Sequence, residues 1–172
     1  MGMDSRAVDA NRPKVLLVDD VPANLLAYKA ILGRMGLELH EAASGHEALA
    51  LVLRHEFAAI LMDVQMPELD GYETAALIRE HASDTPVPVI FITAGDRSEA
   101  REFRGYDSGA IDYLFKPVND KLLISKVRVL TELWTHRRKL AKASDALRRV
   151  NGQLSGLLRG AAEGIVGLNA QG

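Results

Sequence analysis

The sequence predicts an α/β fold: a doubly wound sheet of five parallel strands, followed by one long helix. Three observations carry this prediction. Short apolar runs alternate with amphipathic segments of helical length up to about residue 119, a pattern typical of parallel sheets with helices on both faces. The apolar runs are nearly continuous, as expected for strands that are covered on both faces. Beyond Asn119 proline is absent, and apolar residues recur with a heptad period.

Apolar periodicity and turn residues place the elements in order. We expect strands at residues 14–18, 37–42, 58–62, 89–92 and 111–115. We expect the intervening helices at residues 22–36, 45–55, 73–82 and 97–106. Pro22 suits a first helical turn, and Ser44 with Glu47 three residues later matches a helix N-cap pattern.

Composition excludes several classes of protein. The chain has 172 residues, of which 48% are hydrophobic and 26% charged, values typical of a soluble globular protein with one domain and an appendage. No apolar run approaches the ~18 residues of a membrane span, and the first residues lack the apolar stretch of a secretory signal. Cysteine is absent, which excludes disulfides and thiolate metal sites. We therefore expect a cytoplasmic protein without a membrane partner.

The net charge of −2 conceals an asymmetry. Residues 119–150 carry nine Lys or Arg against three Asp or Glu, whereas residues 1–118 carry a net charge of −8. An acidic body joined to a basic arm suggests two units. Trp134 is the only aromatic residue of the arm, so a solvated helix face explains the charge better than a nucleic-acid interface does. We expect no nucleic-acid partner for this chain.

The basic arm carries a regular apolar stripe. Leucine recurs every seven residues, at Leu133, Leu140, Leu147 and Leu154. A second set lies three positions later and comprises His136, Ala143, Val150 and Leu157. The two sets predict the a/d seam of a coiled coil. A parallel homodimer through residues 121–158 is the preferred interpretation. The alternative is that the stripe packs against its own domain or against a further one.

Four strand ends carry residues with useful chemistry. The first strand ends at Asp19 and Asp20, the third at Asp63, the fourth at Thr93 and the fifth at Lys116. In a parallel sheet these ends share one edge. Three carboxylates so close together repel one another unless a cation such as Mg²⁺ neutralises them. A hydroxyl and an ammonium group beside them suit a transferred phosphoryl group, with Asp63 as the attacking carboxylate.

These residues lie in four motifs that resemble those of the response regulator receiver domain. The motifs are residues 18–20, 62–71, 92–94 and 113–117, and the resemblance covers residues 14–125. It implies a flavodoxin-like (βα)₅ fold. It also implies that Asp63 accepts phosphate from the phosphohistidine of a histidine kinase or phosphotransfer protein. Asp20 and Asp63 would bind Mg²⁺ through carboxylates, Asp19 mainly through water, and Gln65 through its backbone carbonyl.

The resemblance also assigns the residues that respond to phosphorylation. Lys116 would contact the phosphoryl group, and Thr93 would hydrogen-bond it and move. Tyr113 would swing inward as the switch aromatic. The bond between Lys116 and Pro117 would be cis, as it is in the family.

The sequence after the receiver has weaker resemblances of its own. We expect a receiver domain at residues 14–120 and a dimerising helix at 121–158, similar to the signalling helices that follow receivers. Residues 159–172 resemble the opening of a PAS sensor domain, so we expect a helix end, an apolar strand and a turn at Gly172. A further output domain would follow: a diguanylate cyclase, a cyclic-di-GMP phosphodiesterase or a histidine kinase.

Two other functions compete with a receiver. One is a stand-alone phosphatase with an aspartyl nucleophile, although such enzymes place a second acid where this chain has Gln65. The other is a dimerisation module that has lost phosphorylation, against which the complete set of site residues argues. As a receiver, the chain would catalyse its own phosphoryl transfer and dephosphorylation, and enzymatic activity of another kind would belong to the output domain.

Overall fold

The computed structural model describes residues 12–81, 86–95 and 110–169, with side chains at 112–164 in the last range. Its five strands are β1 (Lys14–Val18), β2 (Glu38–Ala42), β3 (Ala59–Asp63), β4 (Val89–Thr93) and β5 (Ala110–Phe115). They form one parallel sheet in the order β2-β1-β3-β4-β5. The predicted fold class is therefore confirmed, and the strand order is that of the flavodoxin-like doubly wound sheet.

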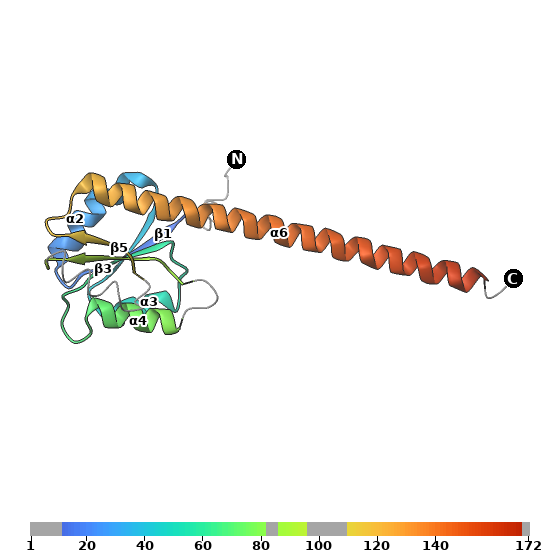
Figure 1. Ribbon diagram of the computed structural model, residues 1–172, viewed down its shortest axis with the longest axis horizontal. Coiled ribbons are helices and arrows are strands. Elements are labelled where there is room, and N and C mark those ends of the chain that lie inside the picture. The colour runs from blue at the N-terminus through green and yellow to red at the C-terminus, as the bar shows by residue number, and fades with distance from the viewer. Residues whose placement is uncertain (1–11, 82–85, 96–109, 170–172) are drawn as a thin grey trace, which may run out of the picture. The chain divides into compact units, whose positions relative to one another are not determined.

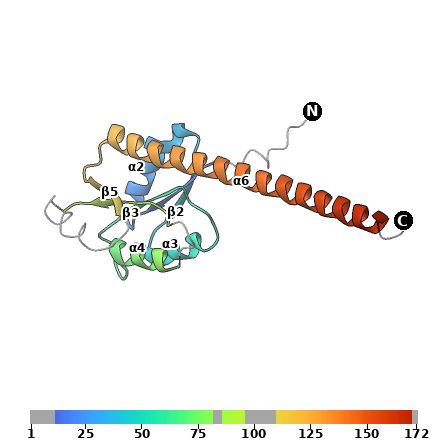
Figure 2. The ribbon, with the colours of Figure 1, turned by 45° about the vertical axis from the view of Figure 1, so that its right-hand side comes forward.

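Helices connect the strands on both sides of the sheet. They are α2 (Pro22–Leu32), a 3₁₀ turn η1 (Gly33–Met35), α3 (Gly45–Val52), α4 (Gly71–Glu80) and α6 (Asp120–Asn169). Figures 1 and 2 show α2 on one side of the sheet and α3 with α4 on the other. The helix expected at residues 97–106 lies outside the described residues. Among the described helices, none is long and apolar enough to cross a membrane.

Local capping explains where two of the helices begin. The Ser44 side chain accepts a hydrogen bond from the Glu47 amide at the start of α3, as predicted. At α4, Asp70 and Glu73 form a reciprocal capping box, which satisfies two backbone donors that a helix start leaves open. The box starts α4 at Gly71, two residues earlier than periodicity alone predicted.

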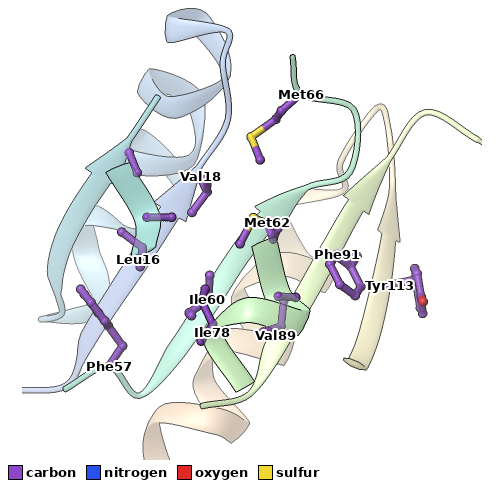
Figure 3. Close-up of a cluster of buried hydrophobic side chains, with 13 residues drawn as sticks. Leu16, Val18, Phe57, Ile60, Met62, Met66, Ile78, Val89, Phe91 and Tyr113 are labelled. Atoms are coloured by element: carbon purple, nitrogen blue, oxygen red, sulfur yellow. The ribbon is translucent and has the colours of Figure 1, made fainter. Parts of the chain in front are cut away.

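Alternate residues of the strands supply two apolar cores, one on each face of the sheet. Leu16, Ile60, Met62 and Phe91 face one way, where they pack with Ile78 of α4; Figure 3 shows this cluster. The opposite face packs with the helices α2 and α6, through Val15, Leu17, Leu61, Ile90, Ile92, Leu25, Tyr28, Leu32, Leu123, Val127 and Leu130. Two covered faces explain why the strands read as continuous apolar runs.

The chain divides into two compact units, residues 1–134 and 135–172. The first unit contains the sheet and the opening turns of α6, where Leu123, Val127 and Leu130 are buried. In the second unit every side chain from residue 139 to 164 is exposed. The predicted boundary at residue 120 thus falls at the start of a helix whose first turns belong to the core of the first unit.

The strand expected near the C-terminus is wrong, because α6 continues as a helix to Asn169. A single strand would leave its backbone N–H and C=O groups without a neighbouring strand, whereas a helix satisfies them within itself. Ala161, Ala162 and Glu163 also have high helix propensity. The described part of residues 159–172 therefore holds no strand that could open a PAS-like domain.

Candidate functional site

The strand register brings the predicted residues to one edge of the sheet. Val18 pairs with Met62, so Asp19 and Asp63 lie level on neighbouring strands. Ile92 lies opposite Asp63, which places Thr93 directly beyond that position on the next strand. Thr93 in turn pairs with Phe115, the residue before Lys116. The site is thus built from consecutive strand ends.

Three carboxylates meet at this edge. Oxygen atoms of Asp19, Asp20 and Asp63 lie within 4.8 Å of one another. Asp19 is completely buried and Asp63 is 2% exposed, while Asp20 is half-buried. Burial raises the pKa of Asp63; Lys116 opposes this shift, and the negative charges of Asp19 and Asp20 add to it. The site therefore concentrates negative charge where water cannot screen it fully.

Lys116 supplies the positive charge. Its Nζ lies 3.0 Å from Asp63 Oδ1 and 3.5 Å from Asp19 Oδ2. Burial alone would lower the pKa of Lys116, but Asp63 and Asp19 outweigh burial and raise it, so this side chain stays charged. Its backbone N–H donates to the Thr93 carbonyl at 2.9 Å. The Lys116–Pro117 bond is cis, as the resemblance implies.

Thr93 ends β4 next to the carboxylates, and Tyr113 lies on β5 opposite Phe91 of β4. Thr93 is 6% exposed, and its Oγ1 accepts a hydrogen bond from the Gly95 amide at 3.0 Å. Tyr113 is 5% exposed and packs against Phe91, with ring centroids 5.5 Å apart; Figure 3 shows the two rings side by side. The structure thus has Tyr113 packed into the core, and its role as a switch stays a prediction.

The structure gives Gly71 a steric role at the site that the sequence analysis did not assign. A Cβ atom at Gly71 would lie 2.2 Å from the Asp63 carbonyl oxygen. The Gly71 amide donates to the Val64 carbonyl at 3.0 Å. Only glycine lets the start of α4 approach the backbone of Asp63 so closely. The Asp70-Gly71 dipeptide was the available signal, but it does not reveal which backbone the glycine faces.

Sequence reasoning also missed Asn24 and Tyr28 on α2. The Asn24 side-chain amide donates to both carboxylate oxygens of Asp19, at 3.1 and 3.0 Å. The Tyr28 hydroxyl lies 3.4 Å from Asp19 Oδ2. Their spacing of four residues places them on the same helix face, which was the signal that could have linked them.

The donor set fits a hard divalent cation. Mg²⁺ prefers oxygen ligands and keeps several waters, and the site offers three carboxylates. Asp63 Oδ1 is buried, and among the described residues only Lys116 Nζ contacts it, at 3.0 Å. It therefore has acceptor capacity that a cation would use. Gln65 follows β3 with an exposed side chain, and coordination through its carbonyl stays a prediction.

The structure thus places a buried aspartate, two neighbouring acidic residues and a lysine together at the carboxyl edge of a parallel five-stranded sheet. A family model described as the response regulator receiver domain matches residues 15–128. The chain therefore belongs to the response regulator receiver domain family, and it contains the receiver of a two-component response regulator.

Curated relatives share this region and more. The response regulator PleD of Caulobacter vibrioides is 35% identical over 158 residues, which cover 92% of this chain and 34% of that protein. The transcriptional regulatory protein SrrA of Staphylococcus aureus is 36% identical over 117 residues, which cover 68% of this chain and 47% of that protein. The chain thus spans a third to a half of the length of these relatives. The family model ends at residue 128, within the helix α6, whereas the match with PleD continues further along that helix.

Solved structures agree with the fold. A receiver domain of a Francisella response regulator is 33% identical, with a TM-score of 0.63, and the match covers 70% of this chain and 98% of that one. The receiver domain of a Pseudomonas aeruginosa sensor histidine kinase is 32% identical, with the same TM-score and coverage. That structure is described as holding a magnesium ion coordinated in its active site cleft.

Proposed function

We propose that Asp63 accepts a phosphoryl group from the phosphohistidine of a histidine kinase or phosphotransfer protein. The observation that carries this proposal is the position of Asp63: it is buried at a strand end, with Lys116 Nζ at 3.0 Å and two further carboxylates within 4.8 Å. A nucleophile needs a neighbouring cation to hold the incoming phosphate, and Lys116 provides one.

The transfer exchanges one bond to phosphorus for another. A carboxylate oxygen of Asp63 forms a bond to phosphorus as the phosphorus–nitrogen bond of the donor breaks. The electron pair of the broken bond returns to the imidazole nitrogen of the donor. Lys116 offsets charge on the phosphoryl oxygens, and the Thr93 hydroxyl, which accepts a hydrogen bond from Gly95, can donate its own proton to one of them.

We infer that Mg²⁺ is the cofactor, held by the carboxylates of Asp20 and Asp63 with Asp19 behind them. When bound, the ion neutralises charge on the carboxylates and on the phosphoryl oxygens. Three observations support this assignment: the oxygen-only donor set, the buried Asp63 oxygen whose one polar contact from the described residues is Lys116, and the magnesium ion described for the Pseudomonas receiver. The coordinating role of the Gln65 carbonyl belongs to the same proposal.

Phosphorylation would be relayed through the sheet. A phosphoryl group adds about −1.5 to −2 charges at a position that Thr93 and Lys116 adjoin. Movement of Thr93 toward it would change the packing of β4 against β5, where Tyr113 contacts Phe91. Tyr113 is then the aromatic residue that reports the change to the surface, as the family resemblance implies.

The output would leave through a dimer of the helix α6. Leu140, Leu147, Leu154 and Leu157 are each more than half exposed, although they follow a heptad spacing that predicts burial against a second helix. A parallel homodimer through residues 121–158 would bury them. A downstream output domain, such as a cyclase, a phosphodiesterase or a kinase, would then sense a change in the helix pair.

One labelling experiment separates the candidate functions. The protein is incubated with a small phosphodonor and Mg²⁺, and the gain of phosphate is followed by intact-mass measurement. A receiver gains one phosphoryl group, and Asp63→Asn abolishes the gain, whereas Asp145→Asn, an exposed change on α6, leaves it unchanged. Sustained turnover of the donor would indicate a phosphatase. Absence of any label would indicate a dimerisation module.

A second experiment tests the helix pairing. The chain has no cysteine, so Leu147→Cys introduces a unique thiol at the predicted seam. Oxidation should crosslink two copies through this residue only if the helices pair in parallel and in register. Arg148→Cys, one position away from the seam, is the matched control and should crosslink poorly. Equal crosslinking of the two variants would contradict the seam, and crosslinking unaffected by phosphorylation would contradict the relay.

A further inference from the structure

The Asp19 carboxylate accepts hydrogen bonds from the N-cap residue of α2 and from two side chains of that helix. Asp19 Oδ1 accepts from the Val21 amide at 2.9 Å and from the Asn24 side chain at 3.1 Å. Asp19 Oδ2 accepts from the Asn24 side chain at 3.0 Å and from the Tyr28 hydroxyl at 3.4 Å. Lys116 Nζ lies 3.5 Å from the same Oδ2. A carboxylate has roughly four acceptor sites, so these five polar contacts can occupy all of them.

The other two acids of the site differ from Asp19 in this respect. Asp63 Oδ1 is buried, and Lys116 Nζ at 3.0 Å is its one polar contact from the described residues. Asp20 is half-buried and accepts no hydrogen bond from the described part of the chain. The three carboxylates therefore divide into one whose lone pairs are occupied by the protein and two that retain capacity for a cation.

The helix that holds Asp19 is itself rigidly placed. Asn24 and Tyr28 lie four residues apart and so share one face of α2. Leu25 and Leu32 of the same helix are 7% and 0% exposed, and they lie in the core that α2 and α6 form with the sheet. Tyr28 is 4% exposed, so its ring is held in the same core.

We propose that Asn24 and Tyr28 are positioning residues that clamp Asp19. The clamp fixes the Asp19 carboxylate beside Lys116 and beside the two carboxylates that would hold a cation. A divalent cation is then held by Asp20 and Asp63, at a set separation from Lys116. This inference rests on the proposed function, because it concerns the same metal site, and it adds two residues from α2 to that site.

The clamp is tested through Mg²⁺ affinity in the unphosphorylated protein, measured by titration of the backbone amide NMR signals. Asn24→Leu keeps the side-chain size but removes two hydrogen bonds, and it should raise the Kd for Mg²⁺ by roughly tenfold, the lower end of what the loss of an outer-shell partner does. Tyr28→Phe keeps the buried ring and removes only the longer hydrogen bond. It should raise the Kd by about two- to threefold.

Two controls separate positioning from general stability. Leu25→Val loosens the same helix without touching Asp19, and it should lower stability while leaving the Kd for Mg²⁺ unchanged. In an Asp19→Asn background, Asn24→Leu should have little further effect, because the group that it positions has been altered already. A merely structural role of Asn24 would instead give additive losses.

The outcomes distinguish this inference from the function on which it rests. Variants at Asn24 and Tyr28 that bind Mg²⁺ as tightly as the parent would overturn the clamp and leave Asp63 phosphorylation standing. Weakening by Leu25→Val as large as that by Asn24→Leu would also overturn it. A parent protein that binds no Mg²⁺ and takes no phosphoryl group would overturn both proposals together.

Discussion

The two units of the chain differ in how far their leucine side chains are buried. In the first unit the strands are closed on both faces, and Leu16, Leu17 and Leu61 have no exposed surface. In the second unit Leu140 and Leu147 are 70% and 65% exposed. The same residue type thus fills a finished core in one region and an uncovered stripe in the other. The first unit holds the candidate site within itself, whereas the second holds the apolar stripe for which we propose a second helix as the partner.

The strongest test of this comparison is one substitution made in each unit. Leu61→Ala opens a cavity in the closed core and should lower the free energy of unfolding by about 2–5 kcal/mol. Leu147→Ala should leave receiver unfolding unchanged and weaken self-association. Urea unfolding followed by circular dichroism measures the first effect, and sedimentation measures the second. If Leu147→Ala destabilised the receiver as much as Leu61→Ala, the stripe would belong to the core and the comparison would be wrong.

Substitution of Gly71 at the site should have the next largest effect on the free energy of unfolding. Gly71→Ala would place a Cβ 2.2 Å from the Asp63 carbonyl oxygen, so the start of α4 or the end of β3 must shift. We expect a loss of about 1–3 kcal/mol in unfolding free energy, together with slower phosphorylation of Asp63. Chemical denaturation and the labelling assay measure the two effects. An unchanged stability would show that α4 does not press on Asp63 in solution.

The success of sequence reasoning varies between these regions for physical reasons. Each strand was predicted to within one residue. For the inner strands β1, β3 and β4 the reason is that a doubly covered strand must be an apolar run, and each of these runs ends at Asp or Thr. The edge strands β2 and β5 include charged residues. The gathering of Asp19, Asp63 and Lys116 followed from parallel topology alone. In contrast, the apolar segment after residue 160 fits a helix as well as a strand, and in the structure it continues the helix α6.

The missed residues share one cause. Asn24, Tyr28 and Gly71 each contact a residue on a different element: Asn24 and Tyr28 of α2 contact the end of β1, and Gly71 of α4 contacts the end of β3. Periodicity along one element does not reveal how closely it packs against another. Asn24 and Tyr28 have ordinary spacing for an amphipathic helix. Their contact with Asp19 appears only when the packing of α2 against the sheet is known.

A smaller effect concerns pH and the charge of the site. Burial raises the pKa of Asp63 above its usual value near 4, so the folded state binds this proton more tightly than the unfolded state does. The stability that this proton contributes is present at low pH and is lost as pH rises through the folded-state pKa. In metal-free buffer, Asp63→Asn removes this loss.

We therefore expect Asp63→Asn to raise the melting temperature at pH 7. The gain should vanish near pH 3, where the parent carboxyl is already protonated. Thermal unfolding at both pH values checks this. A variant that is less stable than the parent at pH 7 would mean that the ion pair with Lys116 outweighs burial.

The smallest effect lies in the second unit, where the same glycine substitution should have the opposite sign. Gly152 has no atom within 4 Å of an added Cβ, and it lies between the seam positions Val150 and Leu154 without occupying one. Gly152→Ala should therefore stabilise α6 by about 0.5–1 kcal/mol through backbone entropy, seen as a higher melting temperature of the helix signal. It should leave self-association intact. If Gly152→Ala instead weakened the dimer, a partner backbone would approach the helix at Gly152, and the face that pairs would not be the leucine seam.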